Sequence, residues 1–269
     1  TTMTHVSMSS MNARNIHLPS VPEQQRIVRI LDKAFEGIAT AEANAEKNLQ
    51  NARALFESQL EAVFIQPGKA WIEKPLEDAV ESNCSLSYGM VQPGEEYPDG
   101  LPVVRPTDLT TKLIRVEGLK RIDPRLAEAY QRTILRGGEL LLCVRGSTGT
   151  ISIASSELAG ANVTRGIVPI RFDANLLIQQ FGYYLLRSAP VKRQIGAKTY
   201  GAALMQINIG DLRKITVAFP SLKEQIDLAR NLDKLHDETQ RLASIYERKL
   251  AALEELKKSL LHQAFSGQL

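Results

Sequence analysis

The sequence predicts an α+β protein in which a β-rich domain is combined with two long helices. Two observations indicate this fold class. A 47-residue segment recurs once, at an offset of 201 residues, and both copies have apolar residues at heptad spacing. Between the copies, short apolar runs alternate with turns that contain Gly and Pro, which is typical of short strands.

The repeat is the strongest signal in the chain. Residues 18–64 reappear without a gap at residues 219–265, and 14 of the 47 aligned positions are identical. The period is too long for a solenoid, whose units reach roughly 50 residues. We therefore interpret the chain as containing two copies of a larger module, arranged on pseudo-twofold lines.

Each copy of the repeat predicts one long amphipathic helix, because apolar residues recur at alternating steps of four and three. The expected apolar seam of the first helix is made of Ile27, Leu31, Ala34, Ile38, Ala41, Ala45, Leu49, Ala52 and Leu55. That of the second is made of Leu228, Leu232, Leu235, Thr239, Leu242, Tyr246, Leu250, Leu253, Leu256 and Leu260. Neither helix can bury its seam alone. A general coiled coil that holds a dimer together is the alternative interpretation.

Composition limits the class of protein further. The 269 residues are 43% hydrophobic, enough for a substantial core, and the net charge is +3. The positive surplus lies in residues 66–218, which carry 19 basic and 15 acidic groups. No apolar run is long enough for a membrane span, and no signal peptide is indicated. Cys84 and Cys143 lack metal-type spacing, so we expect buried, reduced thiols and a cytoplasmic protein.

The middle segment, about residues 70–215, has the pattern of a β-rich domain. The predicted strands are LPVVR, ELLLCV, TISIA and GIVPIRF, and the turns include QPGEE, YPDG, RGG and RGSTG. A helix is expected near NLLIQQFGYYLLRS. By this pattern alone, a β-rich domain without any particular function remains an alternative.

The whole arrangement resembles the specificity subunit of type I restriction-modification systems. PSVPEQQRIVRILDK and PSLKEQIDLARNLDK are similar to the family's entry into each conserved helix. LPVVRPTDL (101–109), GGELLLCVRGSTG (137–149) and GAKTYGAALMQINIGDLRKITVAFPSLKEQ (196–225) are similar to motifs of its target-recognition domain. The resemblance implies a β-rich target-recognition domain plus two long helices that form an antiparallel coiled-coil spacer.

The resemblance divides the chain into four parts. We expect residues 1–20 to be the tail of a truncated first target-recognition domain and 21–65 to be the first spacer helix. Residues 66–218 then form a target-recognition domain, and 219–269 the second spacer helix. The chain opens inside a recognition domain, so we interpret it as a cloned or proteolysed fragment or as a natural half-length subunit.

The function implied is recognition of one half of a bipartite site in double-stranded DNA. Side chains in turns should contact base edges, while basic residues on phosphates set affinity and register. The candidate DNA-binding residues are Ser87, Tyr88, Arg105, Thr107, Arg145, Ser147, Thr148, Lys198, Thr199, Tyr200 and Gln206. Two alternatives stay open: Arg105 instead holds Asp108, and RGSTG is only a hairpin turn.

The chain shows no motif of a methyltransferase and no GxxxxGK phosphate loop, so we expect a non-catalytic subunit. The resemblance implies that modification (methyltransferase) subunits use S-adenosylmethionine and that restriction subunits use ATP and Mg²⁺. We expect modification subunits to grip apolar helix residues that lie off the seams, namely Phe35, Phe56, Ile245 and Leu261; packing against the recognition domain is the alternative. A self-dimer of this chain is a further expectation.

Two rival functions remain at this point. A coiled-coil adaptor would keep the helices and have no affinity for DNA in low salt. An independent DNA-modifying enzyme would methylate DNA when only S-adenosylmethionine is added. The DNA sequence recognised and the base that is methylated do not follow from the amino-acid sequence.

Overall fold

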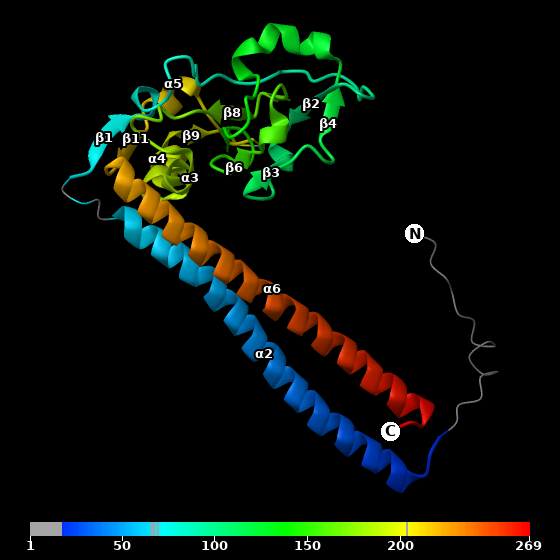
Figure 1. Ribbon diagram of the computed structural model, residues 1–269. Coiled ribbons are helices and arrows are strands. Elements are labelled where there is room, and N and C mark those ends of the chain that lie inside the picture. The colour runs from blue at the N-terminus through cyan, green and yellow to red at the C-terminus, as the bar shows by residue number, and fades with distance from the viewer. Residues whose placement is uncertain (1–17, 66–67, 69, 203) are drawn as a thin grey trace. The chain divides into compact units, whose positions relative to one another are not determined.

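The computed structural model describes residues 18–65, 68, 70–202 and 204–269 (Figure 1). Most of the expected N-terminal tail therefore lies outside the described residues. The described chain divides into two units: residues 18–53 with 240–269 form a helical unit, and the described residues of 54–239 form a globular unit. The two long helices contribute to both units.

These helices are α2 (Val21–Ile65) and α6 (Leu222–Ser266), each 45 residues long. Both bounds differ by 201, so the helices begin and end at equivalent positions of the repeat. Pro22 lies in the first turn of α2, where its missing N–H removes no helical hydrogen bond. Gly267 follows α6 with a φ of 72°, the left-handed conformation that commonly ends a helix.

Within the helical unit, the two helices run antiparallel. Arg53 Nη2 lies 2.8 Å from Glu247 Oε1, while Arg26 Nη2 donates a 2.5 Å hydrogen bond to the carbonyl of Leu269. Low-numbered residues of α2 therefore lie beside high-numbered residues of α6. Ala45, 1% exposed, is the most deeply buried residue of this unit, and such a small side chain allows close approach of two helix backbones.

The expected seams are correct in most positions and wrong in three. Leu55, Leu242 and Leu256 are exposed, at 47%, 39% and 47%. On α6 the buried neighbour of Leu242 is Ala243, at 5% exposed, because the alternation of steps of four and three fits either of these adjacent positions. A prediction from hydrophobicity alone places Leu242, and not Ala243, in the seam.

On α2 the seam changes after Ala52, and the buried positions are Phe56, Leu60 and Phe64. The prediction that Phe56 is an exposed docking residue is therefore wrong. Its side chain is 4% exposed because this end of α2 packs against the core of the globular unit, with the Phe56 ring 6.2 Å from that of Tyr184.

The globular unit is α+β, as the sequence predicts, with many short strands. The bounds are β1 (Ile72–Pro75), β2 (Leu101–Val104), β3 (Leu113–Ile114), β4 (Lys120–Ile122), β5 (Leu140–Cys143), β6 (Ile151–Ala154), β7 (Asn162–Val163), β8 (Ile167–Ile170), β9 (Thr199–Tyr200), β10 (Gln206–Ile207) and β11 (Thr216–Phe219). The shorter helices are α3 (Gln179–Arg187), α4 (Ala189–Lys198) and α5 (Ile209–Arg213). The 3₁₀ helices are η1 (Leu76–Asp78), η2 (Pro106–Asp108), η3 (Pro124–Thr133) and η4 (Ser156–Leu158).

Two sheets of the globular unit have more than two strands. One has the order β3-β6-β5-β8, and the other has the order β4-β2-β7. Each contains one parallel pair, β3 with β6 and β2 with β7, and the remaining neighbours are antiparallel. Two antiparallel pairs complete the unit: β1 with β11, directly before α6, and β9 with β10.

Strand β5 lies at the centre of the hydrophobic core. Leu140 and Leu142 point into the cluster that contains Phe181 and Tyr184 of α3, whereas Leu141 and Cys143 point into a second cluster on the opposite face. Burial on both faces explains why ELLLCV is a continuous apolar run and not an alternating one. The first cluster also contains α6 residues, so the globular unit includes the beginning of α6 in its own core.

Candidate nucleic-acid interface

The candidate residues of the sequence analysis lie in turns and at strand ends of the globular unit. The turn of Arg105 and Thr107 follows β2, and the RGSTG turn connects β5 to β6. Ser87 and Tyr88 precede β2, and the remaining candidates extend from the end of α4 to β10. Main-chain contacts join these separate segments to one another.

The RGSTG turn is joined to the β9–β10 hairpin. Arg145 and Gln206 form an antiparallel β-bridge. The carbonyl of Met205 accepts a 2.8 Å hydrogen bond from the Gly146 N–H and a 3.1 Å bond from the Thr148 hydroxyl. Arg145 and Gln206 are half-buried, whereas Ser147 is exposed at the turn. The turn and the hairpin therefore form one surface with a common backbone frame.

The turn after β2 lies against the same frame. A Cβ atom at Gly166 would be 2.4 Å from Pro106 Cγ and 3.6 Å from the carbonyl oxygen of Arg145. Only glycine fits between these two turns. Thr107 is exposed here, whereas Arg105 forms an ion pair with Asp108, with Nη2 2.9 Å from Oδ1 and Nε 3.1 Å from Oδ2.

The Asp108 carboxylate also accepts a 2.7 Å hydrogen bond from the main-chain N–H of Arg105, which closes the turn on itself. Hydrogen bonding to Asp108 raises the pKa of the Arg105 guanidinium. The pairing matches the alternative in which Arg105 holds a local carboxylate. The side chain remains 39% exposed, so part of the guanidinium can still contact a partner.

Ser87 and Tyr88 lie on a loop that is fastened to the hairpin. The Tyr88 hydroxyl donates a 3.0 Å hydrogen bond to the carbonyl of Ile207, and burial raises the pKa of this phenol. Ser87 Oγ is 2.6 Å from Ser85 Oγ. A Cβ at Gly89 would lie 2.0 Å from the Val163 carbonyl oxygen, so the loop requires glycine there. The Tyr88 hydroxyl is therefore used to position the loop, and its proton is not free to bond to a ligand.

The last group of candidates begins where α4 ends. Lys198 is half-buried, and the Thr199 hydroxyl donates to the carbonyl of Ile195 at 2.6 Å. Tyr200 is 44% exposed, and its hydroxyl lies 2.6 Å from Asn208 Oδ1. In this group Tyr200 offers the largest accessible aromatic surface.

Sequence reasoning missed three residues of this surface. Arg165 is exposed in the turn between β7 and β8, and its main-chain N–H donates to the carbonyl of Met90 at 2.7 Å. Burial is the main influence on the pKa of the Tyr88 phenol and raises it, and the positive charge of Arg165 partly opposes this by lowering the pKa. Within the described part of the chain, neither Arg165 nor Arg145 forms an ion pair with a carboxylate. Leu204 and Met205 are each 45% exposed. A basic residue beside glycine in TRGI was the available signal for Arg165.

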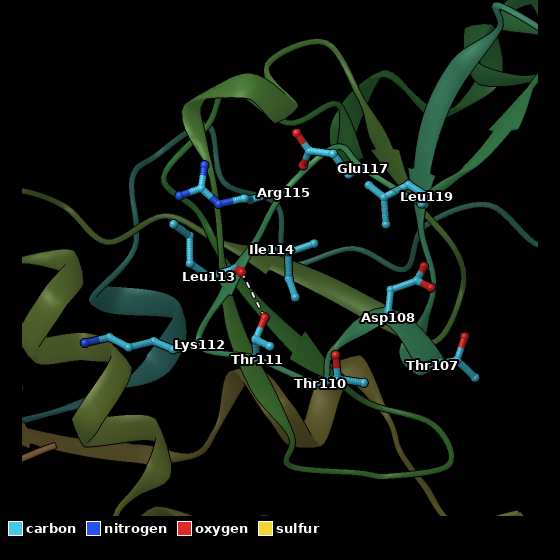
Figure 2. Close-up of a pocket in the computed structure, with 11 residues that line it drawn as sticks. Thr107, Asp108, Thr110, Thr111, Lys112, Leu113, Ile114, Arg115, Glu117 and Leu119 are labelled. Carbon is cyan, nitrogen blue, oxygen red and sulfur yellow. Dashed lines mark hydrogen bonds between the residues drawn. The ribbon is translucent and has the colours of Figure 1, made fainter. Parts of the chain in front are cut away.

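A groove of about 740 Å³ lies beside the turn after β2 (Figure 2). It is lined by Thr107, Asp108, Thr110, Thr111, Lys112, Leu113, Ile114, Arg115, Glu117, Gly118 and Leu119. Hydroxyls, charges of both signs and the apolar side chains of Leu113, Ile114 and Leu119 line it together, so the lining does not by itself select a polar or an apolar ligand.

Lys112 lines this groove, and its ammonium group also connects α3 to α6. Its Nζ lies 2.5 Å from Asp233 Oδ1 and 3.1 Å from the Tyr184 hydroxyl, which itself donates to Asp233 Oδ1 at 2.5 Å. The ammonium group also lies 5.3 Å and 5.1 Å from the ring centroids of Tyr183 and Tyr184. Burial, followed by the hydrogen bond to Asp233, strongly raises the pKa of Tyr184.

Arg187 makes the corresponding connection to α2. Its Nη2 is 3.0 Å from Glu57 Oε1, its Nη1 donates to the Tyr183 hydroxyl at 2.9 Å, and its guanidinium lies 5.3 Å from the Phe56 ring centroid. The ring of His236, on α6, also contacts Phe56, with the two ring centroids 4.9 Å apart. The loop that follows the β2 turn is therefore linked through α3 to both long helices.

The other partner-binding candidates lie in the helical unit. Phe35 is half-buried, with Lys257 Nζ 6.0 Å from its ring centroid. Ile245 is 40% and Leu261 37% exposed. Among the described residues, no helix is both long and apolar enough to cross a membrane, and no group of three His, Cys, Asp or Glu side chains is arranged to hold a metal ion. Both cysteines are free and buried, as expected.

Comparison with known proteins gives a family match over most of the globular unit. The family model described as type I restriction modification DNA specificity domain matches residues 79–248, more than half of the chain. The type I restriction enzyme EcoBI specificity subunit of Escherichia coli is 23% identical over 290 aligned positions, which cover 100% of this chain and 61% of the relative. The putative MjaX specificity subunit of Methanocaldococcus jannaschii is 26% identical over 131 positions, covering 49% of this chain and 29% of the relative.

Solved structures share the fold. A chain from a study of complex assembly and conformational transition of the type I R-M system superposes with a TM-score of 0.78 at 21% identity, over 99% of this chain and 65% of that one. The HsdS subunit from Thermoanaerobacter tengcongensis gives a TM-score of 0.59 at 22% identity, covering 94% and 61%. The chain thus spans about three fifths of the length of these relatives.

Proposed function

Because this chain belongs to the type I restriction modification DNA specificity domain family, we propose that it recognises one half of a bipartite DNA site. The observation that supports this most strongly is the joining of four segments that are distant in sequence. The turns at 105–108 and 145–148, the loop at 85–90 and the β9–β10 hairpin share main-chain contacts or close packing. Turns on a rigid frame are well suited to place side chains in a DNA groove.

Charge supports the same assignment. Arg145 and Arg165 lie in adjacent parts of this surface, and neither is paired with a carboxylate among the residues that the structure describes. Arginine is the side chain that most often contacts guanine specifically, and it also neutralises phosphates. Arg105 is held by Asp108, so we assign it mainly to shaping the turn.

The two helices serve in this proposal as a scaffold for two recognition domains. At the start of α6, Gln225 is fully buried and bonds to the main chain of Leu176 and Ile178 of the globular unit. The equivalent residue of α2, Gln24, is exposed. Val28 of α2 is likewise 53% exposed, whereas its equivalent Ala229 is 3% exposed. A second domain bound to α2 would cover these positions.

We further propose that modification and restriction subunits assemble on this scaffold and supply the catalysis. S-adenosylmethionine, ATP and Mg²⁺ would then bind to those subunits, and the chain described here would perform no chemical step. Ile245 and Leu261 remain the candidates for contact with modification subunits because they are exposed and apolar. The expected location of such an assembly is the cytoplasm, where it meets cellular DNA.

Selection from random duplex DNA tests the recognition function. The full chain, alone and with its modification subunits, should enrich one short sequence. Arg145→Ala and Arg165→Ala should each lower affinity. Loss of a base contact costs about 1–3 kcal/mol and relaxes specificity at one position, whereas loss of a phosphate contact lowers the salt dependence by about one unit.

Arg125→Ala is the matched control, because its guanidinium is already paired with Asp123. It should leave both affinity and specificity unchanged. Equal binding to all sequences, or an affinity that neither arginine variant alters, would contradict the proposal. A role limited to a coiled-coil adaptor predicts no affinity for DNA even in low salt.

A further inference from the structure

The β9–β10 hairpin carries an exposed apolar surface that the packing of the domain does not explain. Leu204 and Met205 lie next to each other at the end of the hairpin, and each is 45% exposed. Tyr200, on the paired strand, is 44% exposed. Single exposed apolar residues are common, but three within residues 200–205 of one hairpin mark this segment as a candidate contact for a partner.

This patch is held firmly in place. The carbonyl of Met205 accepts hydrogen bonds from Gly146 and Thr148, at 2.8 Å and 3.1 Å. Gly201 has a φ of 115°, and a Cβ there would lie 2.3 Å from the Leu204 carbonyl oxygen. These contacts hold the main chain of Met205 against the RGSTG turn, so less of its freedom is lost when its side chain meets a partner.

The surroundings of the patch are polar and basic. Met205 is bonded to the turn that begins with Arg145, and Lys198 precedes the strand of Tyr200. A protein partner that buries an apolar patch would also have to satisfy these cations. The edges of DNA bases combine polar groups with one apolar group, the C5 methyl of thymine, which lies in the major groove and contacts apolar side chains.

We propose that Leu204 and Met205 determine specificity by contacting a thymine methyl group in the major groove. This inference rests on the proposed function and deepens it, because it names the chemical group recognised by one part of the surface. Gln206 of β10 and Arg145, which is bridged to it, would supply the polar contacts to the same or the adjacent base pair.

Deoxyuridine lacks only the C5 methyl of thymine and is the direct probe. Starting from the DNA sequence selected by the chain, each thymine is replaced in turn and the dissociation constant is measured by fluorescence anisotropy. Loss of one buried methyl group should weaken binding about fourfold at one thymine. Met205→Ala or Leu204→Ala should weaken binding to the thymine-containing DNA to a similar extent and should abolish the effect of deoxyuridine at that position.

Leu126→Ala is the matched control, because Leu126 is 40% exposed on η3, away from the hairpin in sequence. It should retain the deoxyuridine effect. Both test residues are exposed, so unchanged fluorescence of Trp71, the single tryptophan, should confirm that the variants are folded.

The outcomes separate this inference from the function on which it rests. If the unsubstituted chain selects no sequence, both are wrong. If it selects a sequence that has no thymine, or whose thymines all tolerate deoxyuridine, only the methyl contact is wrong. The same holds if both variants keep the full deoxyuridine effect. Variants that lose binding of modification subunits but retain DNA affinity would assign the patch to a protein interface and overturn the inference.

Discussion

The contacts among Lys112, Asp233 and Tyr184 hold the beginning of α6 within the globular unit, and substitutions at these residues can test how much they stabilise it. Lys112→Met removes the ammonium charge and keeps most of the aliphatic stem, and Asp233→Asn removes the opposing charge with little change of shape. The two Nζ–Oδ1 and O–Oδ1 distances of 2.5 Å place both donors on one carboxylate oxygen. Each single variant therefore leaves a partly buried charge without the opposite charge, with only the Tyr184 hydroxyl still bonded to it.

The expected size follows from the exposure of the pair. A hydrogen bond to a charged group contributes about 1.5–3 kcal/mol when buried, and an exposed ion pair about 0–1 kcal/mol. The side chains of Lys112 and Asp233 are 29% and 38% exposed, between these limits. Loss of the contacts between the ammonium and the two tyrosine rings adds about 0.5 kcal/mol. We expect each single variant to lose about 1–2 kcal/mol of unfolding free energy, with a coupling of about 1 kcal/mol.

Urea unfolding followed by the fluorescence of Trp71 measures this quantity. Trp71 is the single tryptophan, and its ring centroid lies 5.9 Å from that of Phe64 and 6.0 Å from that of Phe181, so its emission reports on the globular unit. With a urea m value of about 2–3 kcal/mol/M, each single variant should lower the midpoint by about 0.5 M.

The double variant decides the interpretation. If the ion pair is the cause, Lys112→Met combined with Asp233→Asn should lose less than the sum of the two single variants. Strictly additive losses would refute the pairing. Arg230→Met is the control, because its contact with Asp227 is 3.6 Å long and both side chains are more than half exposed. It should change the unfolding free energy by less than about 0.5 kcal/mol.

Three further predictions concern other contacts of the globular unit. Burial and the nearby Lys112 and Arg187 lower the pKa of His236, so the folded state binds fewer protons than the unfolded state at acidic pH. The unfolding free energy should therefore rise with pH up to about 6.5 and then level off. His236→Phe should flatten this rise, measured as urea midpoints between about pH 5 and 8. An equal slope in the variant would contradict this. Phe56→Ala should lose about 3–5 kcal/mol of unfolding free energy, because the ring is 4% exposed; a loss below about 1 kcal/mol, measured by the same unfolding assay, would exclude a core position. Gly166→Ala should push the turn of Pro106 away, since the new Cβ would lie 2.4 Å from Pro106 Cγ. DNA affinity should fall even where circular dichroism shows an intact fold, and unchanged affinity would separate this turn from the interface.

Local patterns were sufficient where one periodicity decides the structure. The four apolar runs LPVVR, ELLLCV, TISIA and GIVPIRF became β2, β5, β6 and β8, because a short apolar run between turn residues has few other ways to be buried. The repeat likewise indicated two helices of equal length, and their bounds differ by the repeat offset.

Local patterns failed where two neighbouring residues competed for one position. Leu242 and Ala243 both satisfy a heptad, and only the packing within the helical unit shows that the alanine is the buried one. Phe56 was expected to be exposed because it lies off the extrapolated seam, but the core of the globular unit reaches α2 at that point. In both cases a contact distant in sequence decides which side chain is buried.

The candidate interface shows the same division. Glycines and basic residues in turns identified Arg145 and its neighbours as candidates, but the ion pair between Arg105 and Asp108 was only one of two open interpretations. Arg165 had only the weak signal of a basic residue beside glycine, and Leu204 and Met205 gave no distinct signal, since a single exposed residue in a turn is common in any sequence. Their importance arises from adjacency to other segments.

The amino-acid sequence by itself determined the element types, the pseudo-twofold repeat of the helices and the family resemblance, because these depend on periodicity and on residues close together in the chain. The tertiary structure alone decided which turns share one surface, which cations are paired and where α2 leaves its partner seam for the globular core. Those features depend on the free energy of contacts between residues far apart in sequence, such as Arg145 with Gln206 and Lys112 with Asp233, and no local pattern encodes them.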